Sequence, residues 1–140
     1  MSAYFSFDVD RPRNLVRITM SGLFREGDMT DFLEARRQAH AQLCCGPNQH
    51  VTLNDVRELK IQPQETVLAF QQMLADPEYR SRRLAFVTAS TLATGQLMRA
   101  LDGRPGRRFD DPQAAEAWLL EAEEVEEVAP LRRMGRFGQI

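Results

Sequence analysis

The sequence predicts one α/β domain built around a mixed β-sheet. Its first segment contains two stretches in which apolar and polar residues alternate, which is typical of a β-hairpin. Segments with apolar residues at helical spacing then alternate with short apolar stretches, and this order gives a sheet whose later strands are largely parallel. A chain of 140 residues, 43% hydrophobic and 27% charged, has the length and composition of a single globular domain.

The N-terminal hairpin is predicted from residues 4–9 and 15–20. In both stretches apolar residues recur at every second position, and residues 10–14 between them, DRPRN, carry the proline and asparagine of a turn. The positions expected to face the core are Phe5, Phe7, Val9, Val16, Ile18 and Met20.

Four helices are predicted after the hairpin. They run from Asp28 to the Gly46-Pro47 pair, from Pro63 to Asp76, from Ser90 or Thr91 to Gly103, and from Asp111-Pro112 to Leu120. The first residues are of types that favour helix N-caps or first turns, and glycine or proline follows the helical spacing where the first three end. The core-facing residues are predicted to be Met29, Phe32, Leu33, Ala39 and Leu43, then Val67, Phe70, Met73 and Leu74, then Leu92, Leu97, Met98 and Leu101, and finally Ala115, Trp118 and Leu119.

Three short strands separate these helices, at residues 51–53, 84–87 and 107–109. Residues 84–87, LAFV, are all apolar, which indicates a central strand covered on both faces. Residues 107–109, RRF, are expected to form an edge strand because charged side chains protect sheet edges from aggregation.

The C-terminal extension differs in character from the domain before it. We place the domain at residues 1–121 and the extension at residues 122–140, which is acidic first and then basic and apolar. The acidic part is expected to lengthen the fourth helix. The basic part docks on this chain, on a second copy, or on nothing, and the sequence does not choose between these.

Charge and hydropathy exclude several classes of function. The net charge of −2 argues against a nucleic-acid-binding protein, which usually carries a basic excess. No apolar run approaches the roughly 20 residues needed to span a bilayer, and the N-terminus lacks the basic start of a secretory signal. We therefore expect a cytoplasmic protein with no membrane span. The adjacent Cys44 and Cys45 are expected to be small apolar residues, because neighbouring thiols do not reach relaxed disulfide geometry.

The predicted element order and two motifs resemble the SpoIIAA-like, or STAS, domain family. The motifs are LNDVREL at the third strand and RRFDDPQAAEAWLL at the end of the domain, and the resemblance covers roughly residues 4–121. It implies a mixed sheet of four or five strands with helices mainly on one face. It also implies a regulatory or protein-binding role, because the best-known members are anti-anti-sigma factors.

The phosphorylation switch of those members is missing from this chain. In the family, a serine in the loop after the third strand is phosphorylated, which adds about two negative charges at a helix N-terminus. Here Asp55 matches the aspartate at the strand end, but no serine or threonine lies between Thr52 and Thr66. Relatives on the same scaffold hold small or apolar ligands, and that role does not need the serine.

A candidate binding site is predicted at the carboxyl edge of the sheet, where ligands of parallel sheets usually bind. Its residues are Asn54, Asp55, Arg57, Gln62, Ser90 and Thr91. Two helix N-termini are expected to point there, which favours an anion. The structural alternative is that Asp55 bonds loop amides, Arg57 neutralises it, and Ser90 or Thr91 caps a helix.

A second candidate is an arginine patch that could meet an acidic partner. It consists of Arg80, Arg82 and Arg83, with Arg104, Arg107 and Arg108 beside the predicted edge strand. The alternative is a solvated loop with charges that protect the edge strand.

No catalytic, metal-binding or cofactor-binding motif accompanies these sites. The two histidines, His40 and His50, are expected to be a core imidazole and a residue remote from the carboxyl edge. GRPG at residues 103–106 lacks the lysine of a phosphate-binding loop. We therefore predict a non-catalytic domain without metal or cofactor that binds a protein of unknown identity or a second copy of itself. The alternative is a carrier or sensor of a small apolar or anionic molecule.

Overall fold

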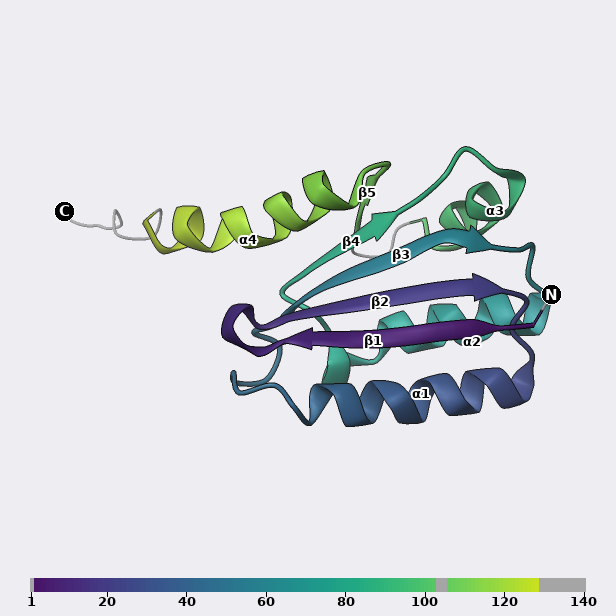
Figure 1. Cartoon of the computed structure of the whole chain (residues 1–140), viewed down its shortest axis with the longest axis horizontal. Coiled ribbons are helices and arrows are strands. Elements are labelled where there is room, and N and C mark those ends of the chain that lie inside the picture. The colour runs from purple at the N-terminus through teal and green to yellow at the C-terminus, as the bar shows by residue number, and fades with distance from the viewer. Residues whose placement is uncertain (1, 103–105, 129–140) are drawn as a thin grey trace.

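The computed structural model describes residues 2–102 and 106–128, and for residues 122–128 it describes the backbone alone. The elements are β1 Tyr4–Asp10, η1 Arg11–Arg13, β2 Leu15–Gly22, α1 Glu26–His40, β3 Val51–Leu59, α2 Gln64–Ala75, η2 Pro77–Tyr79, β4 Arg83–Val87, α3 Leu92–Ala100, β5 Arg107–Phe109 and α4 Pro112–Val128. Figure 1 shows this order along the chain. The predicted order of helices and strands is confirmed.

The sheet has five strands in the order β1-β2-β3-β4-β5. β1 pairs with β2 antiparallel, with Phe7 opposite Ile18, and the remaining three pairings are parallel. The prediction of a hairpin followed by parallel strands is therefore confirmed, and β5 lies at one edge as expected.

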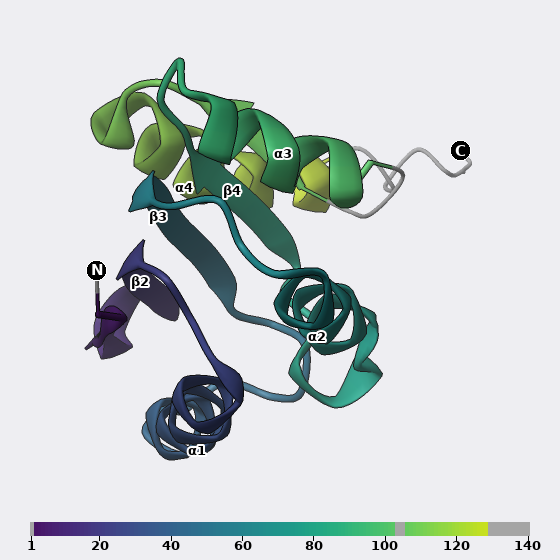
Figure 2. The same cartoon turned by 90° about the vertical axis from the view of Figure 1, so that its right-hand side faces the viewer.

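The helices divide unequally between the two faces of the sheet. Figure 2 shows α1 and α2 on one side of the sheet and α4 on the other. We call the first side the three-helix face, because α3 also packs there, and the second side the α4 face. The three-helix core contains Val16, Ile18, Met20, Phe24, Met29, Phe32, Val56, Leu59, Phe70, Phe86, Leu97 and Leu101. The α4 core contains Leu15, Val51, Leu53, Ala85, Val87, Ala115 and Leu119. Three of the four helices thus lie on one face, as the resemblance implies.

The third strand is longer than predicted. We expected it to end at Leu53, but β3 runs from Val51 to Leu59. The polar residues after Leu53 do not end the strand, because buried Val56 and Leu59 continue its packing on the three-helix face. Asp55 is therefore inside a strand and not at its end.

The first helix also differs from the prediction at both ends. Its N-cap is Arg25, and Asp28 is the third helical residue, whose Oδ2 accepts a hydrogen bond from the Arg25 N–H at 2.9 Å. The helix ends at His40, six residues before Gly46. Leu33 and Leu92 were predicted to face the core, and this prediction is wrong. Leu33 is 38% exposed and Leu92, on α3, is 81% exposed.

The other helix boundaries are close to those predicted. Thr91 is the N-cap of α3 and its Oγ1 accepts a hydrogen bond from the Thr94 N–H at 3.1 Å. Asp111 accepts hydrogen bonds from two N–H groups in the first turn of α4. Pro63, predicted as the first helical residue of α2, is its N-cap, so the helix starts one position later, at Gln64.

The fourth helix continues through Val128, which confirms that the acidic segment lengthens it. The boundary that we placed between residues 121 and 122 thus falls inside a helix. The basic part of the extension, residues 129–140, lies outside the described residues. Across residues 2–102 and 106–128, none of the helices combines the length and the apolar character that crossing a membrane requires.

Candidate functional site

The predicted carboxyl-edge residues do not form one cluster. Asn54 and Asp55 are neighbours within β3, so their side chains point to opposite faces of the sheet. Asn54 is 5% exposed and lines a cavity on the three-helix face, whereas Asp55 lines a groove on the α4 face. The two therefore cannot bind one ligand together.

Asp55 and Arg57 lie two residues apart on the α4 face and pair with each other. Arg57 Nε lies 3.0 Å from Asp55 Oδ1, and its second guanidinium contact, NH2 to Asp55 Oδ2, is 2.7 Å. The Arg57 N–H also donates to Asp55 Oδ1 at 3.1 Å. The hydrogen bond to Asp55 raises the pKa of Arg57. This geometry matches the structural alternative in which Arg57 neutralises Asp55.

Gln62 connects three segments of the backbone. Its Oε1 accepts a hydrogen bond from the Phe24 N–H at 2.9 Å, and its Nε2 donates to Gly22 O at 2.9 Å. Its main chain exchanges two hydrogen bonds of 3.0 Å with the side-chain amide of Gln96 on α3. Gln62 is 4% exposed, so its side chain holds the β3–α2 loop in place and is not presented to solvent.

The surface around this connection is apolar and exposed. Ile61, next to Gln62, is 57% exposed, and Leu92, one turn before Gln96 on α3, is 81% exposed. Ser90 and Thr91 are exposed beside Leu92. Of the residues predicted at this edge of the sheet, Ser90 and Thr91 are exposed, and we use the term carboxyl edge below for these two together with Ile61 and Leu92. Ile61 escaped the sequence analysis, and Leu92 was assigned to the core because its position fits the helical period.

The arginine patch is divided between the two faces. Arg83 packs its guanidinium 4.4 Å from the centre of the Trp118 ring and donates to Trp118 O at 3.2 Å, so it faces α4. Arg80 is exposed and lines the cavity on the other face, and Arg82 is half-buried. The three side chains therefore do not form one exposed surface.

The arginines beside the edge strand also diverge. Arg107 packs against the α4 face, 5.4 Å from the centre of the Trp118 ring. Arg108 lines a groove with residues of α3. Arg104 lies outside the described residues.

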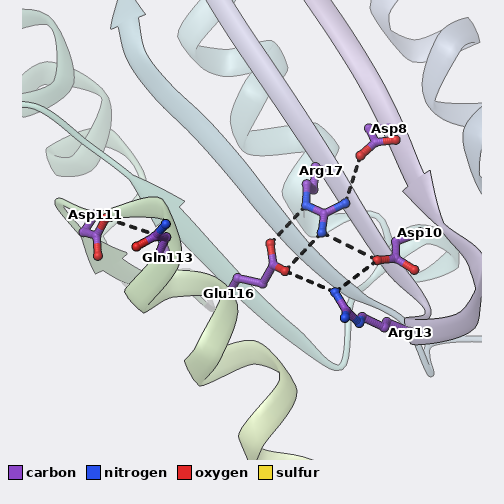
Figure 3. A network of polar contacts seen from close by, with 7 residues as sticks. All are labelled: Asp8, Asp10, Arg13, Arg17, Asp111, Gln113 and Glu116. Atoms are coloured by element: carbon purple, nitrogen blue, oxygen red, sulfur yellow. Dashed lines mark hydrogen bonds and ion pairs between the residues drawn. The ribbon is translucent and has the colours of Figure 1, made fainter.

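An ion-pair network joins α4 to the hairpin on the α4 face. Arg17 contacts Glu116 through two hydrogen bonds of 3.0 Å and Asp8 through one of 2.9 Å, as Figure 3 shows. Asp10 lies 3.5 Å from both Arg17 and Arg13. The hydrogen bond to Glu116 is the main cause that raises the pKa of Arg17. The network is built from β1, η1, β2 and α4 and ties α4 to the sheet.

A polar cavity lies on the three-helix face, between α1, α2 and the first half of the parallel strands. It has a volume of about 60 Å³. Its polar lining comes from Arg36 and His40 of α1, Thr52 and Asn54 of β3, and the segment Asp76 to Ser81 after α2. The remaining lining residues are Ile18, Phe32, Met73, Leu74 and Leu84.

Two histidines pack against each other beside this cavity. The rings of His40 and His50 are 4.5 Å apart, and the His40 ring is 4.9 Å from that of Tyr79. Burial lowers the pKa of His40 to about 4, with smaller effects from His50 and Arg36, and burial also lowers the pKa of His50. Both imidazoles are therefore neutral at pH 7.

His50 also lies 3.3 Å from a hydroxyl, the Oγ of Ser81, measured from Nε2. We did not predict a histidine next to a serine. The Ser81 Oγ is also 2.6 Å from Thr52 Oγ1, and His50 is 3% exposed while Ser81 is half-buried. Within the described ranges, no group of three or more histidine, cysteine or acidic side chains is arranged to hold a metal ion.

A sequence signal for the cavity was present in the first helix. Phe32, Arg36 and His40 are spaced by four residues, which places all three on one helix face. An arginine between two core-facing residues is unusual on such a face, because a buried guanidinium needs partners. We did not use this signal because the apolar stripe alone explained the helix.

Comparison with known proteins identifies the fold. No family model matches the chain, and no curated protein matches its sequence. Among solved structures, it is similar to an uncharacterized protein of the DUF3478 family from Shewanella loihica PV-4, described as having a SpoIIAA-like fold. The two share 16% sequence identity with a TM-score of 0.64, and the match covers 85% of this chain and 96% of the other. The chain therefore has a SpoIIAA-like fold, as the resemblance in its sequence implies.

Proposed function

We propose that this chain is a non-catalytic interaction domain that binds a protein partner through its carboxyl edge. The observation that carries this proposal is the exposure of Leu92, which is 81% accessible on the first turn of α3. Ile61, next to Gln62, is also exposed, and Gln62 bonds Gln96 on the same helix. Exposed apolar side chains gathered on an ordered surface are a feature of protein interaction sites.

The hydrogen bonds beneath this surface support binding without rearrangement. The Gln62–Gln96 pair joins the β3–α2 loop to α3, and Gln62 also bonds the segment after β2. A surface that is ordered before binding loses less conformational entropy when a partner docks.

Regulation by phosphorylation of the β3–α2 loop is not part of this proposal. That loop has no hydroxyl, and Thr66 in the following helix is 2% exposed with its Oγ1 donating to Phe24 O at 2.8 Å. A kinase would have to unfold the start of α2 to reach this hydroxyl. The burial of His50, which is 3% exposed beside Ser81, likewise supports a non-catalytic role, because a general base must be reachable by its substrate.

The test is site-specific photocrosslinking in extracts of the source organism. A photoreactive residue at position 92 should capture one protein, whereas the same residue at position 33, on α1, should not, although Leu33 is also exposed. Leu92→Asp should abolish capture of this protein from a probe at position 61 and leave the melting temperature unchanged. Equal capture from positions 92 and 33, or capture that survives Leu92→Asp, would refute this surface as the binding site.

A further inference from the structure

The polar cavity contains a buried cation whose charge is weakly matched. The Arg36 side chain is 12% exposed, and its nearest carboxylate oxygen, Asp76 Oδ2, is 3.6 Å from NH2. Among the residues that the structure describes, NH1 has only a long contact of 3.4 Å to Met73 O, and the buried Nε has no hydrogen-bond partner. The guanidinium packs 4.0 Å from the centre of the Tyr79 ring, which does not replace a hydrogen-bond acceptor.

Asn54 provides a second, independent indication that the cavity is a place for a bound water or ligand. It is 5% exposed and lines the cavity, and its buried Oδ1 has no hydrogen-bond partner within residues 2–102 and 106–121. Buried polar atoms in folded proteins nearly always have partners, and those that do not mark a place for a water or a ligand. Rotation of the amide by half a turn would present its Nδ2 in place of Oδ1.

The size and remaining lining of the cavity define what could fill it. At about 60 Å³ it has space for roughly four water molecules. Five apolar residues, Ile18, Phe32, Met73, Leu74 and Leu84, form much of its wall. Water would satisfy the polar atoms but would leave this apolar surface in contact with solvent. A small molecule with an anionic end and a short apolar body fits both parts of the lining.

We propose that the polar cavity binds a short-chain organic carboxylate, with its carboxylate at Arg36 and its apolar body against Phe32 and Leu84. Arginine suits this role because its planar guanidinium donates two parallel hydrogen bonds to a carboxylate. Asn54 supplies the contact for a second polar atom of the ligand or for a water that accompanies it. The site is on the three-helix face, and the carboxyl edge does not contribute to it.

The experiment uses the full chain labelled with ¹⁵N and three probes at pH 7 and constant ionic strength. Sodium propionate carries the charge and the short apolar body, propionamide has nearly the same shape without charge, and inorganic phosphate has charge without the apolar body. Propionate should give saturable shifts at Thr52, Asn54 and Ser81 amides, with an affinity at least 10-fold higher than that of propionamide or phosphate.

A matched pair of variants tests the role of Arg36. Arg36→Met should weaken propionate binding at least 10-fold, whereas Arg37→Met removes the same charge from an exposed position on α1 and should leave binding unchanged. Equal binding by propionate and propionamide, or unchanged binding in Arg36→Met, would overturn the proposal, as would a cavity that binds none of the probes and holds only water.

The unmodified chain provides a measurement that does not depend on the folding of either variant. Propionate should raise its melting temperature more than propionamide does at the same concentration and ionic strength. The absence of this difference would also overturn the proposal.

Discussion

Arg17 and Arg36 lie on opposite faces of the sheet, and the partners of their guanidinium groups differ. Arg17 projects from β2 on the α4 face, and Arg36 projects from α1 on the three-helix face. On the α4 face, all three guanidinium nitrogens of Arg17 contact carboxylates, with distances of 2.9 to 3.0 Å to Asp8 and Glu116. On the three-helix face, the Nε of Arg36 has no hydrogen-bond partner in the described part of the chain, and the nearest carboxylate oxygen there is 3.6 Å from NH2. Arg36 is also the more deeply buried, with 12% of its side chain exposed against 31% for Arg17.

The pKa values of the two arginines move in opposite directions because different effects dominate in the two environments. Hydrogen bonding to Glu116 raises the pKa of Arg17, whereas burial is the largest effect on Arg36 and lowers its pKa. A buried charge with well-placed partners can be accommodated in the fold. A buried charge that is poorly paired lowers stability unless a ligand of opposite charge binds to it. The groove beside Arg17 has a volume of about 570 Å³, yet Arg17, Asp55 and Glu116 in its lining already pair within the chain. The smaller cavity beside Arg36 is therefore the better candidate for a ligand.

The largest loss of stability is expected when Phe32, a buried residue of the cavity wall on the three-helix face, is truncated. Phe32 is 0% exposed and contacts the rings of Phe5, Phe7 and Phe24. Phe32→Ala should lower the free energy of unfolding by about 3–5 kcal/mol. Leu33→Ala, at the exposed neighbouring position, should cost much less, and urea denaturation of the two variants measures the difference. Similar losses would show that the packing of α1 is not as described.

The two arginines can be compared directly by replacing each with methionine. Arg17→Met leaves Arg13, which lies 3.5 Å from Asp10 and 3.6 Å from Glu116, as the remaining cation of the network. We expect a loss of about 1–2 kcal/mol in the free energy of unfolding, because the network is partly exposed. Arg36→Met removes a buried charge that lacks good partners, and its effect should stay within about 1 kcal/mol in either direction. A larger loss in Arg36→Met than in Arg17→Met would reverse the comparison.

The stability of the three-helix face should also depend on pH through His40. Its pKa is about 4 in the folded chain and near 6.5 when unfolded, so between these values the unfolded chain binds a proton that the folded chain does not. The free energy of unfolding should therefore fall as the pH is lowered from 6.5 to 4, by roughly 1–2 kcal/mol for a ring that is partly exposed.

Comparison of the wild type with His40→Phe isolates this effect. Phenylalanine keeps an aromatic ring against Tyr79 but does not titrate, so the variant should lose less stability over this pH range. Arg36 and His50 face the ring in both proteins, and the lowered pKa of His50 leaves a smaller dependence of the same sign. Parallel curves for the two proteins would assign the acid sensitivity to other groups.

The smallest effect is expected at the ion pair on the outer face of α1. Arg37 and Glu34 are one turn apart and exposed, and the hydrogen bond to Arg37 lowers the pKa of Glu34 to about 2. Exposed pairs of this kind contribute little to stability and are screened by salt. Glu34→Gln should leave the melting temperature within experimental error at physiological salt. A clearly lower melting temperature would mean that exposed ion pairs on the outer side of α1 also contribute to stability.

The sequence predicted the element order because alternation and helical spacing are local patterns. The hairpin, the four helices and the edge strand all follow from them. It failed at β3, where Asn54, Asp55 and Arg57 looked like the end of a strand, because polar side chains within a strand are tolerated when its faces provide partners or solvent. It also placed Leu92 in the core, because helical spacing does not tell which turns of a helix are covered.

The sequence by itself determined the fold class, the absence of a hydroxyl in the β3–α2 loop, and the position of Arg36 on the inner face of α1. Tertiary structure alone decided that Arg17 is surrounded by carboxylates and that Arg36 is not. The physical reason is that the partners of Arg36 come from α2 and the segment after it, and those of Arg17 from β1 and α4. Distances between such segments are set by packing, and no local pattern in the chain encodes them.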